Sequence, residues 1–123
     1  MNKFEFRAWT KDAEYMLCHR ELMNQWEDLD DYSIFTDPNL IVMQWTGRTA
    51  MSVKIFDGDY ISFDHEYNGK VGFIAVVEYF EGAYIVDDFL NLITCENIKV
   101  LGNIYEDYET YKNHDFDMRY PIR

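Results

Sequence analysis

Tight-turn dipeptides between alternating apolar and polar residues constrain the fold of this chain more than any other feature of its sequence. Asn68-Gly69 is the strongest of these signals, because both central positions of a type I′ turn need positive φ. It joins one strand to a long strand over residues 70–80, and Glu81-Gly82 turns that strand into the next one, over residues 83–86. The second half of the chain is therefore predicted to be a β-meander.

The first half of the chain shows the same two-residue period, with one exception. Residues 3–9 alternate cleanly and, after a turn, residues 14–19 return as the second arm of a hairpin. Residues 20–31 differ, because apolar side chains recur there at helix-like spacing among acidic ones, which indicates a short helix or an ordered loop. Residues 40–45 are a continuous apolar run of strand length, and Thr46-Gly47 is expected to end it.

Further turns divide the rest of the chain into short strands. Asp57-Gly58 precedes an alternating strand, and residues 98–104 are predicted to be the last strand, with Gly102 as a bulge or a point of close approach. The tail from residue 105 is expected to begin with one or two helical turns. Short strands at this spacing favour a mainly β fold, a small and partly open barrel or roll with an N-terminal hairpin, because closing a sheet hides its edges.

Composition places the chain among folded, acidic proteins. Its 123 residues fit one domain or one domain with a folded extension, and 48% of them are apolar. Aromatic residues make up 18%, enough for a substantial core at this length. The net charge of −12 excludes electrostatic attraction to nucleic-acid phosphates or anionic lipid as the basis of function.

The sequence also carries signals about cellular location. No stretch approaches the roughly 18 consecutive apolar residues of a transmembrane helix. Charges at Lys3, Glu5 and Arg7 leave no apolar signal-peptide region at the N-terminus. Cys18 and Cys95 are too few for a disulfide framework, so we expect reduced thiols in a cytoplasmic protein.

Five short blocks span roughly residues 3 to 107. They are Lys3-Phe4-Glu5-Phe6-Arg7-Ala8-Trp9, Met43-Gln44-Trp45-Thr46-Gly47, Ile55-Phe56-Asp57-Gly58-Asp59-Tyr60-Ile61, Val76-Val77-Glu78-Tyr79 and Val100-Leu101-Gly102-Asn103-Ile104-Tyr105-Glu106. In this order they resemble the KFRAW, QYTG, IYEGDIV, VVEY and VIGNIYE segments of the YopX family of phage and prophage proteins.

This resemblance implies a mainly β fold with an SH3-like, partly open barrel, encoded by a phage or prophage. It brings no activity with it, and a fold alone does not imply a function. We predict a YopX-like, mainly β domain over residues 1–107. Residues 108–123 are then an acidic, tyrosine-rich C-terminal tail, short and helical at its start.

Acidic residues concentrate in the second half of the chain. Between Ile55 and Asp117 there are 14 of them against three lysines, which accounts for −11 of the net charge of −12. Such a single-sign field costs self-repulsion, so one interpretation is a surface that binds a partner, and the other is a solvated face that maintains solubility. The first interpretation assigns partner binding to Asp57, Asp59, Asp64, Glu66, Glu78, Glu81, Asp87, Asp88, Glu106, Asp107 and Glu109.

Tyrosines late in the chain are the second group of candidate binding residues. Tyr105, Tyr108 and Tyr111 lie among the acidic residues, and tyrosine is favoured at interface centres because it contributes a large contact area at little rotamer cost. The alternative is that such aromatic side chains belong to the core of a small barrel. Stacking on single-stranded nucleic acid is disfavoured by the negative charge of the region.

No catalytic or metal-binding motif is found. Cys18 and His19 are neighbours on a predicted strand, so their side chains point to opposite faces and do not pair. The acidic residues and histidine within residues 57–66 lack the spacing of a calcium loop, and no zinc-site or phosphate-loop spacing occurs. We therefore expect no catalytic residues, no metal and no cofactor, and a chain that is not an enzyme.

The preferred functional hypothesis is an acidic inhibitor or modulator of a host protein that handles nucleic acid, such as a CRISPR or restriction nuclease. The carboxylates would compete with DNA or RNA for the basic surface of that partner, and tyrosines would anchor the complex. Direct binding of nucleic acid or membrane is not expected. The alternative hypothesis is a self-assembling structural protein, a homo-oligomer whose acidic surface serves only solubility.

Overall fold

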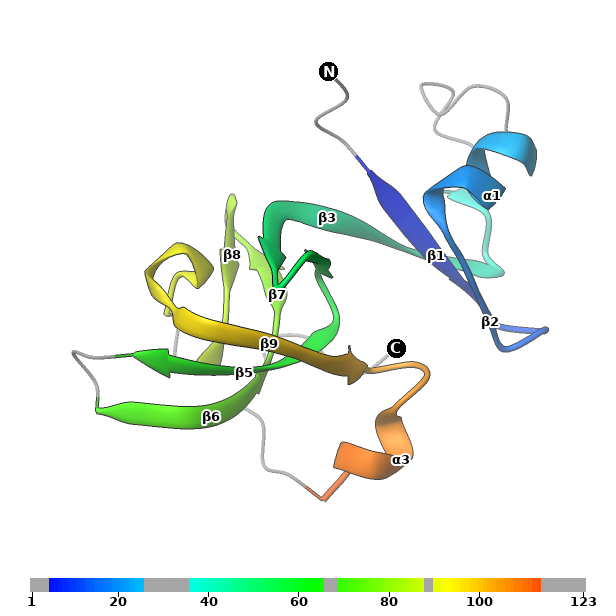
Figure 1. Ribbon diagram of the computed structural model, residues 1–123. Helices are drawn as coiled ribbons and strands as arrows, with labels where there is room; N and C mark the ends of the chain where they lie inside the picture. Colours follow the sequence, from blue (N-terminus) through cyan, green and yellow to red (C-terminus); the bar gives the residue numbers. More distant parts are fainter. Residues whose placement is uncertain (1–4, 26–35, 66–68, 88–89, 114–123) are drawn as a thin grey trace. The chain divides into compact units, whose positions relative to one another are not determined.

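The computed structural model describes residues 5–25, 36–65, 69–87 and 90–113 (Figure 1). The chain divides into two compact units, and the boundary falls between Trp45 and Thr46. Each unit contains a hydrophobic cluster of its own. No helix in the described ranges is long and apolar enough to cross a membrane.

The first unit is built on the predicted N-terminal hairpin. Strands β1 (Phe6–Thr10) and β2 (Tyr15–Leu17) pair antiparallel, and β1 also pairs with the first part of β3 (Leu40–Ala50), with Ala8 opposite Val42. Helix α1 (His19–Gln25) follows β2. The buried side chains of Ala8, Leu17, Leu22 and Leu40 form the hydrophobic cluster of this unit.

Two element boundaries in this part of the chain differ from the prediction. The second arm of the hairpin ends at Leu17, and His19 begins α1, where its Nδ1 accepts a hydrogen bond from Phe6 N–H at 3.2 Å. For residues 20–31 the sequence left a short helix or an ordered loop open; the structure shows a helix as far as Gln25, and residues 26–31 lie outside the described ranges. Strand β3 continues to Ala50, because Gly47, which has no Cβ, takes a φ of 87° within the strand.

The second unit contains the remaining strands. They are β4 (Val53–Phe56), β5 (Asp59–His65), β6 (Lys70–Val76), β7 (Glu78–Phe80), β8 (Ala83–Ile85) and β9 (Glu96–Asn103). Strand β5 is central in a three-stranded antiparallel sheet of order β6-β5-β9, β7 pairs with β8 as a hairpin, and β4 is hydrogen-bonded to β3. A 3₁₀ helix, η4 (Leu92–Thr94), precedes β9, and helix α3 (Tyr108–Tyr111) follows it (Figure 1).

The predicted fold class is confirmed: a mainly β protein with curled sheets of short strands and only short helices in the described ranges. The turns at Asp57-Gly58 and Glu81-Gly82 lie where predicted, and α3 confirms a helical turn in the tail. The hairpin between β5 and β6 is also present, with Gly69 at a φ of 64°, whereas Asn68 lies outside the described ranges.

Gly102 fulfils both roles predicted for it. The register of β9 on β5 shifts between Val100 and Gly102, so Leu101 is the extra residue of a bulge. A Cβ added at Gly102 would lie 2.5 Å from Cγ of Asp107 and 3.0 Å from its Cβ, a spacing that real side chains do not tolerate. The absence of a side chain at Gly102 therefore lets the segment after β9 fold back against the strand.

The single long strand predicted over residues 70–80 is wrong. It is interrupted at Val77, which separates β6 from β7. Val77 N–H donates to Asp59 O at 2.9 Å, and Val77 O accepts from Gly58 N–H at 2.7 Å. The backbone of this residue is thus bonded to the turn between β4 and β5, and an uninterrupted apolar run in the sequence does not reveal such a change of partner.

Strand β5 separates two hydrophobic clusters. Ile61 and Phe63 are fully buried in the larger one, together with Ile55 and Val77. Tyr60 belongs to a second, smaller cluster with Val76 and Ile104. Successive side chains of a strand point to opposite faces, so Tyr60 and Ile61 face different clusters, and both faces of β5 are covered.

Substitutions of Phe63 and Phe73 test which side chains contribute most to the stability of the second unit. The two rings lie edge to face with centroids 5.9 Å apart, but Phe63 is fully buried and Phe73 is 38% exposed. We expect Phe63→Ala to lower the free energy of unfolding by about 3–5 kcal/mol. Phe73→Ala is the matched control, with an expected loss of about 1 kcal/mol. Urea denaturation measures both, and equal losses would contradict this assignment of the core.

Candidate protein-binding surface

Backbone hydrogen bonds around Gly58 join three segments of the second unit. Gly58 N–H donates to Val77 O at 2.7 Å, and Gly58 O accepts from Ile104 N–H at 2.9 Å. The turn between β4 and β5, the residue between β6 and β7, and the end of β9 therefore meet at one point. Several of the acidic residues predicted to bind a partner flank this junction: Asp57, Asp59, Glu78, Glu106 and Asp107.

Two of these carboxylates are buried, so they do not belong to an acidic surface. Asp59 is 1% exposed, and its Oδ2 accepts a hydrogen bond from Phe56 N–H at 2.8 Å across the turn. Glu78 is 6% exposed at the start of β7. Asp57 lies in the turn and only Asp59 lies in β5, so the two carboxylates do not follow one another along a strand face.

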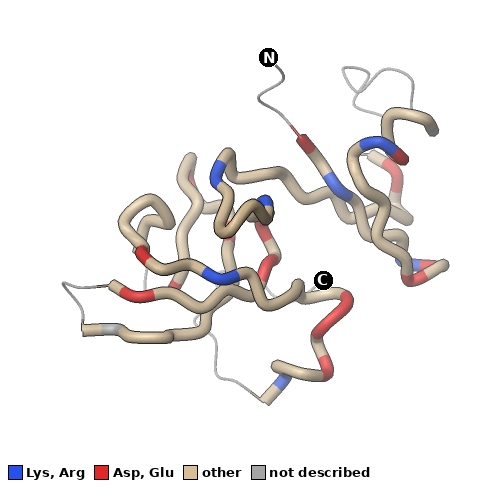
Figure 2. Tube along the Cα trace, in the orientation of Figure 1, with Lys and Arg blue, Asp and Glu red and all other residues tan. Residues whose placement is uncertain are grey.

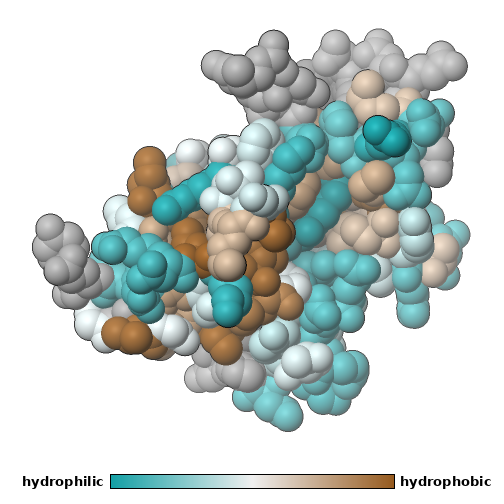
Figure 3. Space-filling view, viewed as in Figure 1, coloured by the Kyte–Doolittle hydropathy of each residue, from teal (hydrophilic) through white to brown (hydrophobic). Residues whose placement is uncertain are grey.

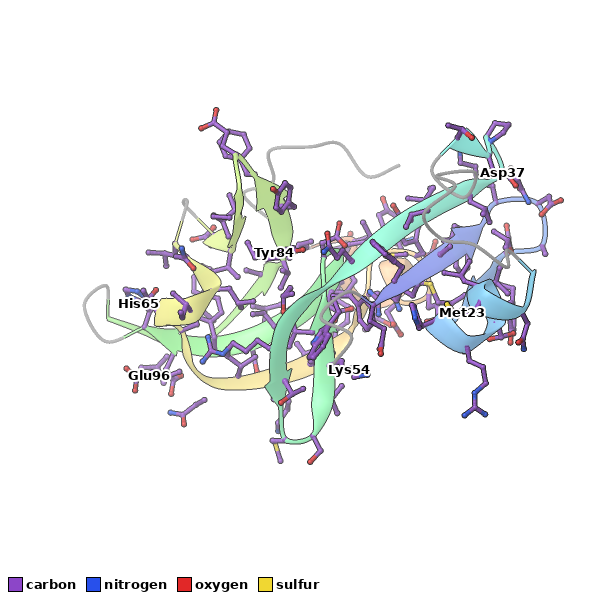
Figure 4. The ribbon with its side chains drawn as sticks, turned by 90° about the horizontal axis from the view of Figure 1, so that it is seen from above. Met23, Asp37, Lys54, His65, Tyr84 and Glu96 are labelled. Atoms are coloured by element: carbon purple, nitrogen blue, oxygen red, sulfur yellow. The ribbon has the colours of Figure 1, made fainter. Side chains whose placement is uncertain are left out.

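Asp64 accepts hydrogen bonds in an irregular part of the sheet. The register of β5 on β6 shifts between Phe63 and His65, and its register on β9 shifts between Ser62 and Asp64. The Oδ1 of Asp64 accepts from Gly72 N–H at 2.7 Å, and its Oδ2 accepts from Asn97 Nδ2 at 2.8 Å. The bond from Asn97 and, to a smaller extent, the bond from Gly72 hold the pKa of Asp64 below its usual value. His65 and Glu96, labelled in Figure 4, mark this end of the sheet, distant from Tyr84.

Three of the five remaining acidic candidates lie in the described ranges. Glu81 is exposed in the turn of the β7–β8 hairpin, and Asp87 is half-buried just after β8. Glu66 and Asp88 lie outside the described ranges. Asp57 is half-buried. Burial of Tyr84 is the main cause that raises the pKa of its hydroxyl to about 12, and the negative charge of Asp57 adds to this effect. Among the described members of this group, Glu81 alone is exposed.

A compact acidic group does form after β9, and Asn103 organises it. The Oδ1 of Asn103, a buried residue, accepts from Tyr105 N–H at 3.0 Å and from Glu106 N–H at 2.8 Å. Its Nδ2 donates to Glu106 Oε1 at 2.8 Å, and its backbone N–H donates to Asp107 Oδ2 at 3.0 Å. The side chain and the backbone of Asn103 together thus hold this loop. Sequence reasoning missed the role of Asn103, although an asparagine beside Gly102 at a strand end is a signal for such a turn.

The three predicted tyrosine anchors have different environments. Tyr105 is half-buried against the cluster of Tyr60, Val76 and Ile104. The ring of Tyr111 lies 4.5 Å from that of Tyr60, centroid to centroid, at an interplanar angle of 42°. Burial raises the pKa of Tyr60, with smaller electrostatic contributions from Asp107 and the two tyrosines of α3. Tyr108 is 40% exposed, so it is the member of the three with the most surface to offer a partner.

The acidic-tyrosine surface is therefore a short continuous stretch: Glu106, Asp107, Tyr108 and Glu109. Figure 2 shows its acidic residues as a run of red segments after β9, with a basic residue at the end. That residue is Lys112, whose Nζ lies 2.6 Å from Glu109 Oε2 in an exposed ion pair that contributes little to stability. Among the described residues, no group of three or more His, Cys, Asp or Glu is arranged to hold a metal ion.

The hydrogen bonds of Asp64 predict a pH-dependent contribution to stability. Because its pKa is lower in the folded chain than in the unfolded chain, the contribution is complete above the ordinary pKa and is lost as the pH falls through the folded pKa. We expect Asp64→Asn to destabilise the fold at neutral pH and the difference from wild type to shrink toward about pH 2. Urea unfolding across this range measures it.

Asn97→Ala completes the comparison, because it removes the hydrogen bond that lowers the pKa of Asp64 most. In a double-mutant cycle with Asp64→Asn, the two changes should cost less together than the sum of their separate costs. A difference between wild type and Asp64→Asn that stays constant at all pH values would contradict this role of Asp64.

Comparison with known proteins adds a likeness of fold. The chain is similar to the crystal structure of protein EF1440 from Enterococcus faecalis, with a TM-score of 0.57 and 19% sequence identity over 87% of this chain and 96% of that one. No protein-family model and no curated protein matches the chain. The resemblance to the YopX family stays a prediction from the five sequence blocks, and the chain shares its fold with EF1440.

Proposed function

We propose that this chain is a non-enzymatic binding protein, encoded by a phage or prophage of YopX type, that modulates a nucleic-acid-handling protein in the host cytoplasm. Its acidic-tyrosine surface docks on a basic, nucleic-acid-binding surface of the partner and competes there with DNA or RNA. A defence nuclease of the CRISPR or restriction type has such a surface. The net charge of −12 adds a long-range field that speeds association.

The observation that carries this proposal is the position of Tyr108. Tyr108 begins α3 directly after a loop that Asn103 holds in place, and in the sequence it lies between the exposed residues Glu106 and Glu109. A rigid aromatic side chain buries a large area at low entropic cost, and flanking carboxylates pair with the lysines and arginines that otherwise bind phosphates. A preformed loop also lowers the ordering cost of binding.

Self-assembly remains the second candidate because of an exposed apolar strand. In the described part of the chain, β6 lies at the edge of its sheet, and its Val71 and Phe73 side chains are 83% and 38% exposed. Hydrophobic side chains are visible on the viewed face of the second unit in Figure 3. Such an edge is a site for pairing with another copy of the chain.

A capture experiment with two matched double variants tests the proposal. Tyr108→Ala/Glu109→Lys changes the acidic-tyrosine surface, and Tyr79→Ala/Glu81→Lys makes the same chemical changes at exposed residues of the β7–β8 hairpin. Tagged proteins are incubated with the heparin-binding fraction of host lysate at about 0.1 M and about 0.5 M salt. We expect wild type and the hairpin variant to retain a nucleic-acid-binding protein at low salt only.

The surface variant should bind that protein at least about ten-fold more weakly, as expected for loss of an aromatic anchor and a charge pair. Added duplex DNA should release it from wild type. Equal capture by both variants, or capture that DNA does not reduce, would contradict the competitor. Recovery of the chain alone, with a mass that rises with concentration in light scattering, would establish self-assembly in its place.

A further inference from the structure

A pocket of about 470 Å³ lies in the second unit and shares no residue with the acidic-tyrosine surface. The end of β3, the β7–β8 hairpin and the segment around η4 contribute its lining. This volume is within the range of sites that bind small organic molecules. Besides Arg48, the side chains of the lining that are not fully buried are those of Thr46, Ala83, Tyr84, Asn91 and Ile93.

Three of these side chains keep a hydrogen-bond donor that the described part of the chain does not use. The Oγ1 of Thr46 accepts from Arg48 N–H at 3.2 Å, so its own hydroxyl hydrogen can point to a ligand. The Oδ1 of Asn91 accepts from Ile93 N–H at 3.0 Å, which leaves its Nδ2 as the donor. The ring of Tyr84 lies edge to face with that of Tyr79, and this contact leaves the hydroxyl hydrogen to donate. A ligand that fits these groups has to accept hydrogen bonds.

Arg48 belongs to the lining, but the protein itself engages its charge. The guanidinium donates to the carbonyl oxygen of Leu92, and its Nη2 donates to Cys95 O at 2.9 Å. Arg48 also has a further interaction within the chain. Its role is therefore to fasten the end of β3 to η4, and the ligand has to be recognised by other groups.

The electrostatic environment of Tyr84 favours a neutral acceptor over an anionic one. Burial raises the pKa of the Tyr84 hydroxyl to about 12, and the negative charge of Asp57 adds to this effect. The hydroxyl is therefore protonated at physiological pH and donates. The same charge of Asp57 repels an anion at this hydroxyl, whereas the carbonyl oxygen of an amide accepts there without carrying a net charge.

Apolar groups beside these donors define the second requirement for the ligand. The side chain of Ile93 is 76% exposed, and Ala83 and Tyr84 are half-buried. Leu92, next to Ile93, is buried in the core, so it supports the pocket without offering a contact surface. A flat apolar group that packs on Ile93 and Ala83 removes exposed aliphatic surface from water, and this transfer favours binding.

We propose that this pocket binds a small, uncharged aromatic amide. The carbonyl oxygen of the ligand accepts from the Tyr84 hydroxyl, Thr46 and Asn91 donate to further acceptors, and the aromatic ring packs on Ile93 and Ala83. This site is independent of the proposed protein partner, because no residue of the acidic-tyrosine surface belongs to it.

Titration with benzamide, followed by ¹H–¹⁵N correlation spectra of the full chain, tests the site. Benzoate is the matched control, because it keeps the ring and replaces the amide by a carboxylate. We expect benzamide to give saturable shifts centred on the backbone amides of residues 46–48, 82–84 and 91–93, with an affinity in the millimolar range typical of so small a ligand. Benzoate should bind at least about five-fold more weakly.

Three results of this titration would overturn the proposal. They are the absence of saturable shifts with benzamide up to about 20 mM, shifts centred outside the pocket, and binding of benzoate as tight as that of benzamide.

Two matched pairs of variants locate the binding groups. Tyr84→Phe removes the donor and should weaken binding of benzamide about two- to ten-fold, whereas Tyr79→Phe makes the same change on the same hairpin outside the lining and should have no effect. Ile93→Ala should weaken binding about three-fold or more, whereas Val71→Ala, at a side chain of β6 that is 83% exposed, should not. Equal affinities within either pair would contradict the proposal.

Discussion

The two hydrogen bonds of Gly58 hold the second unit together at the junction of three segments. One of them joins the turn between β4 and β5 to Val77, and the other joins it to Ile104 at the end of β9. A residue in this turn with a φ of 88° has to be glycine or accept strain, which is why Asp57-Gly58 suits the position. The buried carboxylate of Asp59 completes the turn by accepting the N–H of Phe56.

The placement of the C-terminal segment follows from this junction. Ile104 is fixed by Gly58, and Asn103, one residue earlier, bonds to the loop that carries Glu106 and Asp107. Helix α3 then lays Tyr111 on Tyr60, on the face of β5 opposite Ile61. A four-residue helix has no stability of its own, so the tertiary contacts decide its position. The position of the acidic-tyrosine surface therefore depends on the sheet that supports it.

The positions of several turns could be predicted from the sequence, whereas the burial of individual side chains could not. The turns at Asp57-Gly58 and Glu81-Gly82 could be located because glycine takes positive φ without strain, a preference that is visible in the dipeptide itself. The close approach at Gly102 involves Asp107, which is also near in the sequence. The turn at Met51 and Ser52 escaped prediction, since both residues take positive φ (51° and 68°) without the usual Asn or Gly. Its conformation is imposed by the pairing of β3 with β4.

The candidate site was predicted only in part, for a related reason. Charge counts do not distinguish Glu78, which the sheet buries, from Glu106, which it exposes. Asp64 reads as a surface acid in the sequence, but the irregular register of β5 gives it Gly72 and Asn97 as partners. Such roles depend on which strands become neighbours, and this information is spread over the whole chain.

Native-state hydrogen exchange of three backbone amides tests the junction most directly. If the bonds around Gly58 support the unit, the amides of Gly58, Val77 and Ile104 should exchange only through global unfolding, as slowly as the slowest amides of β5. Exchange of these three amides as fast as that of Gly82 in the exposed β7–β8 turn would contradict the account, because the C-terminal segment would then have no fixed support.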